Sequence, residues 1–144
     1  MEEAFRLTLD YLKTRQQFGS PIGRFQALQH RFSDLLIELE QVRSAVINAA
    51  GHLGDDPHSR DRHIAAARNL IGRAGRLVAE EAIQMHGAAG VSQWTPLAGL
   101  YTGQRTLRLA DGPDEVHHMV VGRAETRKYT GEEEDPAMAA VWRK

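Results

Sequence analysis

Residues 59 to 90 read SRDRHIAAARNLIGRAGRLVAEEAIQMHGAAG, and this stretch decides the fold. Apolar residues recur every three or four positions along it, at Ile64, Ala67, Ile71, Ala74, Val78, Ala82 and Met85. This spacing predicts an amphipathic helix from Ser59 to Met85. Its two interior glycines, Gly72 and Gly75, each cost about 1 kcal/mol relative to alanine. We therefore expect other helices to pack closely against this face and offset that loss.

The predicted helix ends in a segment with two glycines, Gln84-Met85-His86-Gly87-Ala88-Ala89-Gly90. Glycine adopts a positive φ without the steric cost of a Cβ atom, and it lets the backbone come close to a neighbouring group. A second glycine-marked site is Asp111-Gly112-Pro113-Asp114-Glu115, where the proline and the two acids are typical of a helix start. We predict that polar ligand atoms are held at these two sites.

Helical spacing continues on both sides of the central stretch. Further helices are expected over residues 2 to 16, 25 to 53, 97 to 109 and 113 to 129. We expect the second to bury a single apolar stripe from Phe25 to Leu53, the third to be interrupted near Gly103, and the last to bury Val116, Met119, Val120 and Ala124. No segment shows a convincing strand pattern. The sequence therefore predicts an all-α fold, an antiparallel four-helix bundle over residues 1–130, followed by a charged and mobile tail at 131–144.

Composition excludes several classes of protein. The 144 residues contain no cysteine, which rules out disulfides and thiolate metal sites. Eighteen Lys and Arg face nineteen Asp and Glu, so no overall field favours nucleic acid or an anionic membrane. No signal-type run opens the chain, and no apolar run approaches the roughly 18 residues of a spanning helix. We expect a cytoplasmic protein.

Seven histidines raise the question of a metal site. A carboxylate-bridged di-iron bundle needs Glu-x-x-His spacing on two helices, and this chain offers it only once, from Glu115 to His118. The isolated histidines His30, His52 and His86 are interpreted as structural or surface residues. We therefore predict no metal site.

Arg15 stands near the end of the first predicted helix and has two interpretations. An arginine there complements the helix dipole. It also provides a planar guanidinium that can grip phosphate oxygens through two parallel hydrogen bonds. The residue alone does not decide between them.

Four blocks of sequence, taken together, resemble a known family. They are Tyr11-x-x-x-Arg15-x-x-Phe18-Gly19, Pro21-Ile22 with Phe25-Gln26, Ala82-Ile83-Gln84-x-His86-Gly87-x-x-Gly90, and Asp111-Gly112-Pro113-Asp114-Glu115-Val116. Their order and spacing resemble those of the C-terminal helical domain of the acyl-CoA dehydrogenases, over residues 4 to 123. In that family the bundle follows an N-terminal helical domain and a middle β-domain, and the 144 residues contain neither.

The resemblance implies an FAD site. Arg15 and Gln26 match contacts to the flavin dinucleotide of a neighbouring subunit, with the arginine at its phosphates. Gln84, Gly87 and Ala88 match the segment that receives the adenosine end of that same FAD. The family usually has a second glycine where Ala88 stands, which implies a less close approach.

The resemblance also implies a catalytic base. In many members a glutamate directly before the glycine of this block removes the α-proton of the acyl chain, and Asp111 stands at that position. Its arm is shorter by one C–C bond, about 1.5 Å. Pro113 stands where the family usually has a threonine beside the FAD of its own subunit, and Glu115 matches a position that is Gln or Glu in many members.

We therefore expect the C-terminal domain of an FAD-dependent acyl-CoA dehydrogenase that catalyses α,β-dehydrogenation of an acyl-CoA. The expected partners are the acyl-CoA, an electron acceptor, the missing β-domain or a partner chain, and further copies in a dimer or tetramer. This chain by itself is expected to be inactive. The alternative is a helical oligomerisation module that binds no nucleotide. On both interpretations, the small-residue face from 64 to 82 is a candidate seam between copies.

Overall fold

A computed structural model of the protein describes residues 1–130. The helices are α1 (Glu2–Thr14), α2 (Gln26–Gly51), α3 (Pro57–His86), α4 (Ala88–Val91), α5 (Leu97–Leu107) and α6 (Asp114–Thr130), with a short 3₁₀ helix η1 at Ile22–Arg24. The prediction of an all-α fold is confirmed. None of these helices is long and apolar enough to cross a membrane. The tail expected at 131–144 lies outside the described residues.

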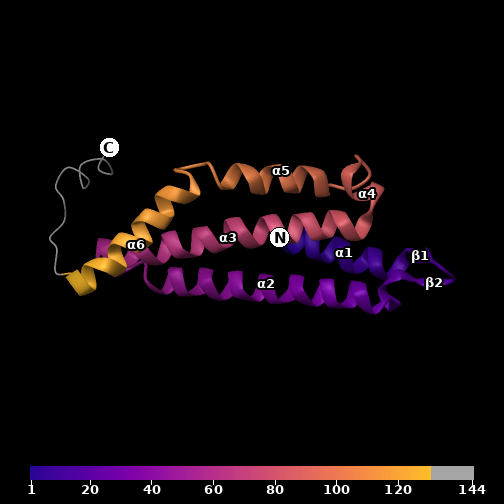
Figure 1. The fold of residues 1–144 in the computed structure, drawn as a ribbon, viewed down its shortest axis with the longest axis horizontal. Helices are drawn as coiled ribbons and strands as arrows, with labels where there is room; N and C mark the ends of the chain where they lie inside the picture. The colour runs from indigo at the N-terminus through magenta and orange to yellow at the C-terminus, as the bar shows by residue number, and fades with distance from the viewer. Residues whose placement is uncertain (131–144) are drawn as a thin grey trace.

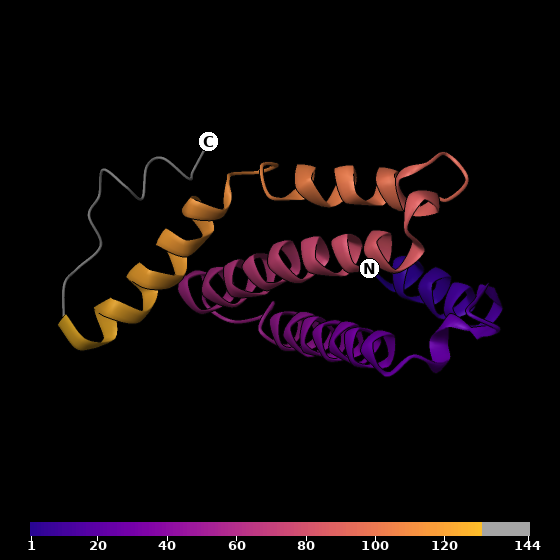
Figure 2. The ribbon, with the colours of Figure 1, turned by 45° about the vertical axis from the view of Figure 1, so that its right-hand side comes forward.

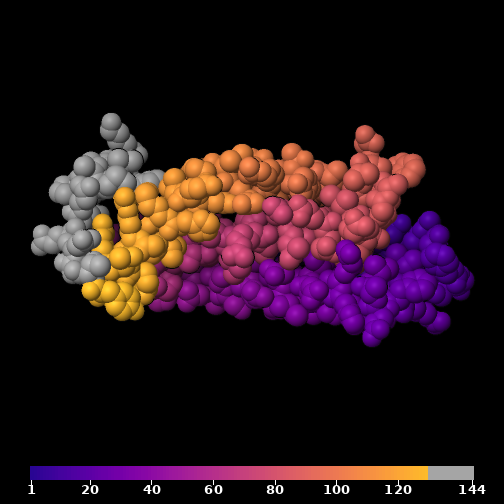
Figure 3. Space-filling model, viewed as in Figure 1, coloured from indigo at the N-terminus to yellow at the C-terminus, as the bar shows by residue number. Residues whose placement is uncertain are grey.

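The central element is α3, the helix predicted from the opening stretch. Helices α1, α2, α5 and α6 all contact it. Helices α1 to α3 alternate in direction, and α5 and α6 both run back against α3 (Figure 1). Seen from a second direction, α6 leaves the line of α5 and runs obliquely past the start of α3 (Figure 2). The space-filling view shows α5 and α6 lying along one side of α3 (Figure 3). Most of the chain is therefore organised around one helix.

The long helix α3 begins and ends as its sequence dictates. The Asp56 carboxylate accepts hydrogen bonds from the backbone N–H groups of His58 and Ser59, at 3.0 and 3.2 Å, and Pro57 occupies the first turn. At the other end, Gly87 takes φ +59° and stops the helix. These caps extend α3 two residues before and one residue after the predicted bounds.

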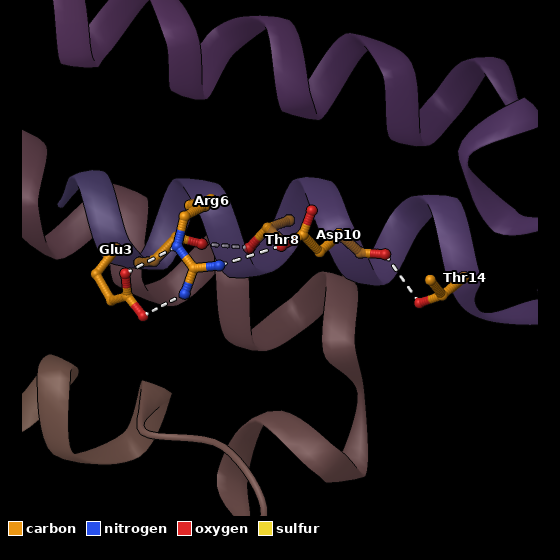
Figure 4. Close-up of polar contacts among 6 residues, drawn as sticks. Glu3, Arg6, Thr8, Asp10 and Thr14 are labelled. Atoms are coloured by element: carbon orange, nitrogen blue, oxygen red, sulfur yellow. Dashed lines mark hydrogen bonds and ion pairs between the residues drawn. The ribbon is translucent and has the colours of Figure 1, made fainter.

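The first helix carries its polar network on the outer face (Figure 4). The Arg6 guanidinium donates to the Glu3 carboxylate at 2.8 Å and to the Asp10 carboxylate at 3.2 Å, which is the i,i+3 and i,i+4 geometry of a solvated helix face. The inner face buries Ala4, Thr8 and Leu12. The Thr8 hydroxyl donates to the Ala4 carbonyl at 2.8 Å, so this buried polar group is satisfied.

The expectation that residues 2 to 16 are all helical, with no strand nearby, is wrong at its C-terminal end. Helix α1 stops at Thr14, and two short antiparallel strands, β1 (Gln16–Gln17) and β2 (Ser20–Pro21), pair across Phe18 and Gly19. Both turn residues have positive φ, 54° and 79°, which is the backbone that a two-residue hairpin requires. Strands of two residues are too short to show an alternating pattern, so the sequence gives no sign of them.

The helix predicted over residues 97 to 109 is not interrupted. Helix α5 runs continuously through Gly103, because the glycine is exposed and sits in a helix whose other residues pack on α3. The helix ends at Leu107, two residues earlier than expected.

The single buried stripe predicted for α2 is only partly correct. Leu35, Leu39, Val42 and Ala49 are buried, whereas Val46 and Leu53 are exposed. A second set of apolar side chains, Leu36, Ile37 and Ile47, also faces solvent. In α6, Val116, Met119, Val120 and Ala124 are partly buried rather than buried, because this helix packs on one side only.

The main core lies where α1, α2, α3 and the start of α5 meet. It is formed by Ala4, Leu12, Ile22, Leu35, Val78, Ala82, Met85 and Leu97. The rings of Phe5 and Phe32 stack against it, with centroids 4.4 Å apart. This core fixes the end of the bundle that carries the hairpin and α4.

Candidate functional site

The first group of predicted site residues lies at the end of the bundle that carries the hairpin. The Tyr11 ring stacks on the His86 ring, with centroids 4.3 Å apart, and so joins the last turn of α1 to the last turn of α3. His86 is buried and its Nδ1 donates to the Ala82 carbonyl at 2.7 Å, so it is structural, as expected. The structure thus gathers the chain segments around 15, 26 and 84 to 88 at one end (Figure 1).

The site residues of this group are all exposed: Arg15, Gln26, Gln84, Gly87 and Ala88. Arg15 caps α1 in an extended conformation, and its guanidinium forms no ion pair within residues 1–130. The Arg15 carbonyl accepts from the Ile22 N–H at 2.8 Å, which ties the residue to the hairpin base. Gln26 starts α2, and Gln84 lies in the last turn of α3. An unpaired guanidinium suits a phosphate or nucleotide ligand.

The backbone at Gly87 is open to a ligand. Its φ of +59° is one that residues with a Cβ rarely adopt, and no atom lies within 4 Å of the position where a Cβ would stand. Ala88 begins α4, and both residues are exposed. Three residues later, at Gly90, a Cβ would meet the Ile83 carbonyl oxygen at 2.7 Å, so α4 lies tightly on the end of α3. Because α4 packs tightly on α3 at Gly90 while the space around Gly87 is open, the backbone at Gly87 is presented at the surface.

The second group, Asp111, Pro113 and Glu115, lies in the bend between α5 and α6. Asp111 has φ +53°, an uncommon conformation for a residue other than glycine, and its side chain is 85% exposed. Pro113 and Glu115 are also exposed. The carboxylate of Asp111 is therefore presented at the surface of the bend, outside the bundle core.

An arginine from α3 supports this bend, and the sequence analysis missed it. Nη2 of Arg68 donates to the carbonyl oxygens of Leu107 and Ala110, and its Nη1 lies 3.5 Å from Asp111 Oδ2. The Arg68 side chain is 29% exposed. A lone arginine within the small-residue face of the central helix was the sequence signal that could have identified it.

A second ion pair closes the bend. Nε and Nη2 of Arg108 both lie 2.5 Å from Asp114 Oδ2, and both side chains are mostly buried. The interior glycines of α3 provide the room: a Cβ at Gly72 would stand 3.0 Å from Cγ of Arg108, and one at Gly75 would overlap the Gln104 side chain. The expected close packing against these glycines is confirmed, and it occurs within one chain.

That packing corrects the predicted seam. Ala67, Gly72, Ala74, Gly75, Val78 and Ala79 are buried by the other helices of the same chain. This part of α3 is therefore not available as a contact between copies.

The histidines do not form a metal site within residues 1–130. His52 is not isolated, because its ring stacks on His63 at 3.7 Å and its Nδ1 lies 2.7 Å from the Asp55 carboxylate. His117 faces the bend, where burial and then the positive charge of Arg68 lower its pKa below the usual value. It is therefore neutral at neutral pH and adds no positive charge beside Asp111.

The two groups of site residues are separated along the bundle. Arg68, beneath the bend, and His86, at the hairpin end, are 18 positions apart along α3. At 1.5 Å per residue, this is about 27 Å along the helix axis. Each group must therefore contact a different part of a large ligand, or a different ligand molecule.

Comparison with known proteins identifies similar sequences. Residues 1–126 match the family described as acyl-CoA dehydrogenase, C-terminal domain. The chain is 37% identical to "Probable acyl-CoA dehydrogenase FadE2" of Mycobacterium tuberculosis, over 86% of this chain and 31% of that protein. It therefore spans about a third of the length of that relative.

Solved structures share the fold. Butyryl-CoA dehydrogenase from Megasphaera elsdenii superposes with a TM-score of 0.82 at 29% identity, over 88% of this chain and 33% of that one. PigA in complex with FAD gives a TM-score of 0.80 at 28% identity, over the same 88% and 33%. The match over residues 1–126 and this shared helical fold lead to one conclusion: the chain belongs to the acyl-CoA dehydrogenase family and corresponds to its C-terminal domain.

Proposed function

We propose that this chain is the C-terminal part of an FAD-dependent enzyme that introduces a double bond between the α and β carbons of an acyl-CoA thioester. The observation that carries the proposal is Asp111, a carboxylate exposed on a bend that ion pairs hold from two sides. Family membership supports the substrate class, because the relatives that match over most of this chain are named for acyl-CoA.

Asp111 is proposed as the general base. One of its oxygens, Oδ2, lies 3.5 Å from Arg68, and the other has no hydrogen-bond partner within residues 1–130. That free oxygen takes the proton from the α-carbon, and the electron pair of the broken C–H bond forms the new double bond. FAD, when bound, supplies the acceptor for the hydride that leaves the β-carbon. Because the side chain of aspartate is shorter than that of glutamate, the acyl group then has to lie closer to this bend than it would if a glutamate stood at position 111.

The residues present fit a bound FAD. The unpaired Arg15 guanidinium suits its phosphates, and the open backbone at Gly87 suits close approach of its adenosine end. Gln26 is proposed to contact the same FAD as Arg15, and Gln84 and Ala88 to contact its adenosine end together with Gly87. Pro113 and Glu115 are proposed to face the FAD bound next to Asp111. Because about 27 Å of α3 separates these two groups, we propose that they contact FAD molecules of different subunits. A homo-oligomer follows from that geometry.

Other partners are proposed on the same basis. The flavin ring and the thioester need walls that a bundle alone does not provide, so a β-domain or partner chain completes each pocket, and an electron acceptor reoxidises the flavin. The alternative is an oligomerisation module without catalysis. An apolar groove of about 520 Å³, lined by Met1, Leu39, Val42, Val46 and Ile47, favours self-association, but it does so under both proposals.

The test uses the assembled enzyme that contains this chain together with its β-domain. Asp111→Asn removes the base without changing the size of the side chain, so kcat should fall roughly 10²- to 10⁴-fold. Arg15→Ala should weaken FAD binding, measured by flavin fluorescence during titration. Lys13→Ala removes an exposed charge of α1 two residues away and should leave both quantities unchanged.

Two results would count against the proposal. Full activity in the Asp111→Asn enzyme would remove Asp111 from the chemistry. Unchanged FAD affinity in the Arg15→Ala enzyme, with unchanged assembly, would remove the phosphate site at the end of α1.

A further inference from the structure

We propose that Arg68 is a positioning residue for the carboxylate of Asp111, acting through the backbone of the bend between α5 and α6. The inference rests on the proposed function, because it concerns how the proposed base is held. It assigns a role to a residue that belongs to neither of the two groups of site residues.

The guanidinium of Arg68 satisfies the end of α5. The last carbonyl groups of a helix have no partner within the helix, and a cation there also complements the helix dipole. Nη2 of Arg68 donates to the carbonyl oxygens of Leu107, the last residue of α5, and Ala110, the residue before Asp111. One side chain from α3 thus fixes the two peptide groups that bracket the approach to Asp111.

This anchoring has a specific consequence for Asp111. Its φ of +53° is unfavourable for a residue with a Cβ, and such a conformation persists only where its surroundings hold it. The φ of Asp111 decides the direction in which the carboxylate leaves the bend. Because Arg68 holds the Ala110 carbonyl, it holds the plane of the Ala110–Asp111 peptide group, relative to which the φ of Asp111 is set.

The charge pair between Arg68 and Asp111 is the weaker contact. At 3.5 Å, with the Asp111 side chain 85% exposed, it is loose and screened by water. Arg68 therefore steadies the bend without binding both oxygens of the carboxylate. A tighter, bidentate ion pair would occupy the carboxylate oxygen of Asp111 that has to accept a proton.

The ion pair between Arg108 and Asp114 has a different structural role. It joins the two ends of the bend to each other, and Gly72 of α3 leaves room for it one helical turn beyond Arg68. Arg68, which lies on α3, contacts the middle of the bend at Ala110 and Asp111. Loss of Arg68 should therefore loosen residues 107 to 111 while the two helices stay joined.

The experiment compares Arg68→Met with Arg76→Met in the assembled enzyme. Methionine keeps much of the apolar length of the side chain. Arg76 lies on the same helix and, among residues 1–130, forms an ion pair only with Glu80, near the surface. Hydrogen exchange measured by mass spectrometry should be about tenfold faster in the peptide spanning 105 to 112 of the Arg68→Met enzyme. Its kcat should fall roughly 10- to 100-fold with KM changed less than about twofold, because a base displaced by about 1 Å loses rate rather than binding.

Rescue separates positioning from simple loss of stability. Added guanidinium ion should restore part of kcat in the Arg68→Met enzyme, but not in the Asp111→Asn enzyme. If Arg68→Met does not fold, Arg68→Lys provides the test, because an ammonium keeps the charge but cannot reach both carbonyl groups as a fork. Its kcat is expected to lie between those of the wild type and the methionine variant.

The outcomes distinguish this inference from the proposed function. If Asp111→Asn abolishes activity while Arg68→Met matches Arg76→Met in both exchange and kcat, Asp111 remains the base and the role of Arg68 is overturned. If Asp111→Asn retains full kcat, the proposed function fails and the inference fails with it. Faster exchange and a lower kcat in the Arg68→Met enzyme alone, with rescue by guanidinium, support it.

Discussion

At the scale of single residues, Gly90 and Gly103 look alike in the sequence and differ in the structure. A Cβ at Gly90 would stand 2.7 Å from the Ile83 carbonyl oxygen, a backbone atom that cannot easily move, whereas a Cβ at Gly103 meets nothing within 4 Å. Gly90→Ala should lower the free energy of unfolding by about 1–3 kcal/mol through overpacking. Gly103→Ala should raise it by up to about 1 kcal/mol, because alanine favours the helix. Urea unfolding measures both, and a loss of stability in Gly103→Ala would contradict the open environment of α5.

The site shows what could be predicted at this scale. The positive φ at Gly87 follows from the freedom of glycine to adopt that backbone conformation, and the exposure of Asp111 follows from the preference of a carboxylate for water. The role of Arg68 could not be predicted, because its partners lie about 40 residues away, in the bend between α5 and α6. Sequence spacing shows which residues share a helix face, but not which carbonyl groups a long side chain reaches.

At the scale of the helices, the start of α3 depends on one side chain. Asp56 accepts from two backbone N–H groups that have no partner within the helix. Asp56→Ala should therefore lower the free energy of unfolding by about 1 kcal/mol. Asp61→Ala removes an exposed carboxylate that, within the described part of the chain, pairs only with Arg60, and it should change the free energy of unfolding by less than about 0.5 kcal/mol. Equal effects of the two substitutions in thermal unfolding would show that the cap contributes nothing.

The helices were largely predictable, and the errors share a physical cause. Long runs with regular apolar spacing gave α2 and α3 to within two or three residues at each end. The hairpin was missed because two-residue strands show no period, and the break predicted at Gly103 does not occur because packing on α3 outweighs the low helix propensity of one glycine. Local pattern therefore predicts where helices lie, and contacts between helices decide where weak positions stay helical.

At the scale of the whole molecule, both proposed FAD contact surfaces are open and incomplete. The groups at the hairpin end and at the bend are exposed and lie about 27 Å apart along α3. We therefore expect that this chain by itself, mixed with FAD and passed through gel filtration, elutes without flavin absorbance and does not oxidise an acyl-CoA. Protein that stays yellow and turns over an acyl-CoA unaided would contradict the proposal that a β-domain completes the site. The matched control is the same chain assembled with that domain.

The central position of α3 also determines how the molecule loses its structure. An isolated helix with two interior glycines has little stability in water, so α3 depends on the neighbours that cover it, and each neighbour depends in turn on α3. Detaching any one of these neighbours exposes the face of α3 that it covered, and α3 then loses its helical structure. Heating should therefore melt the six helices together in a single cooperative transition, with no stable half-molecule along the way.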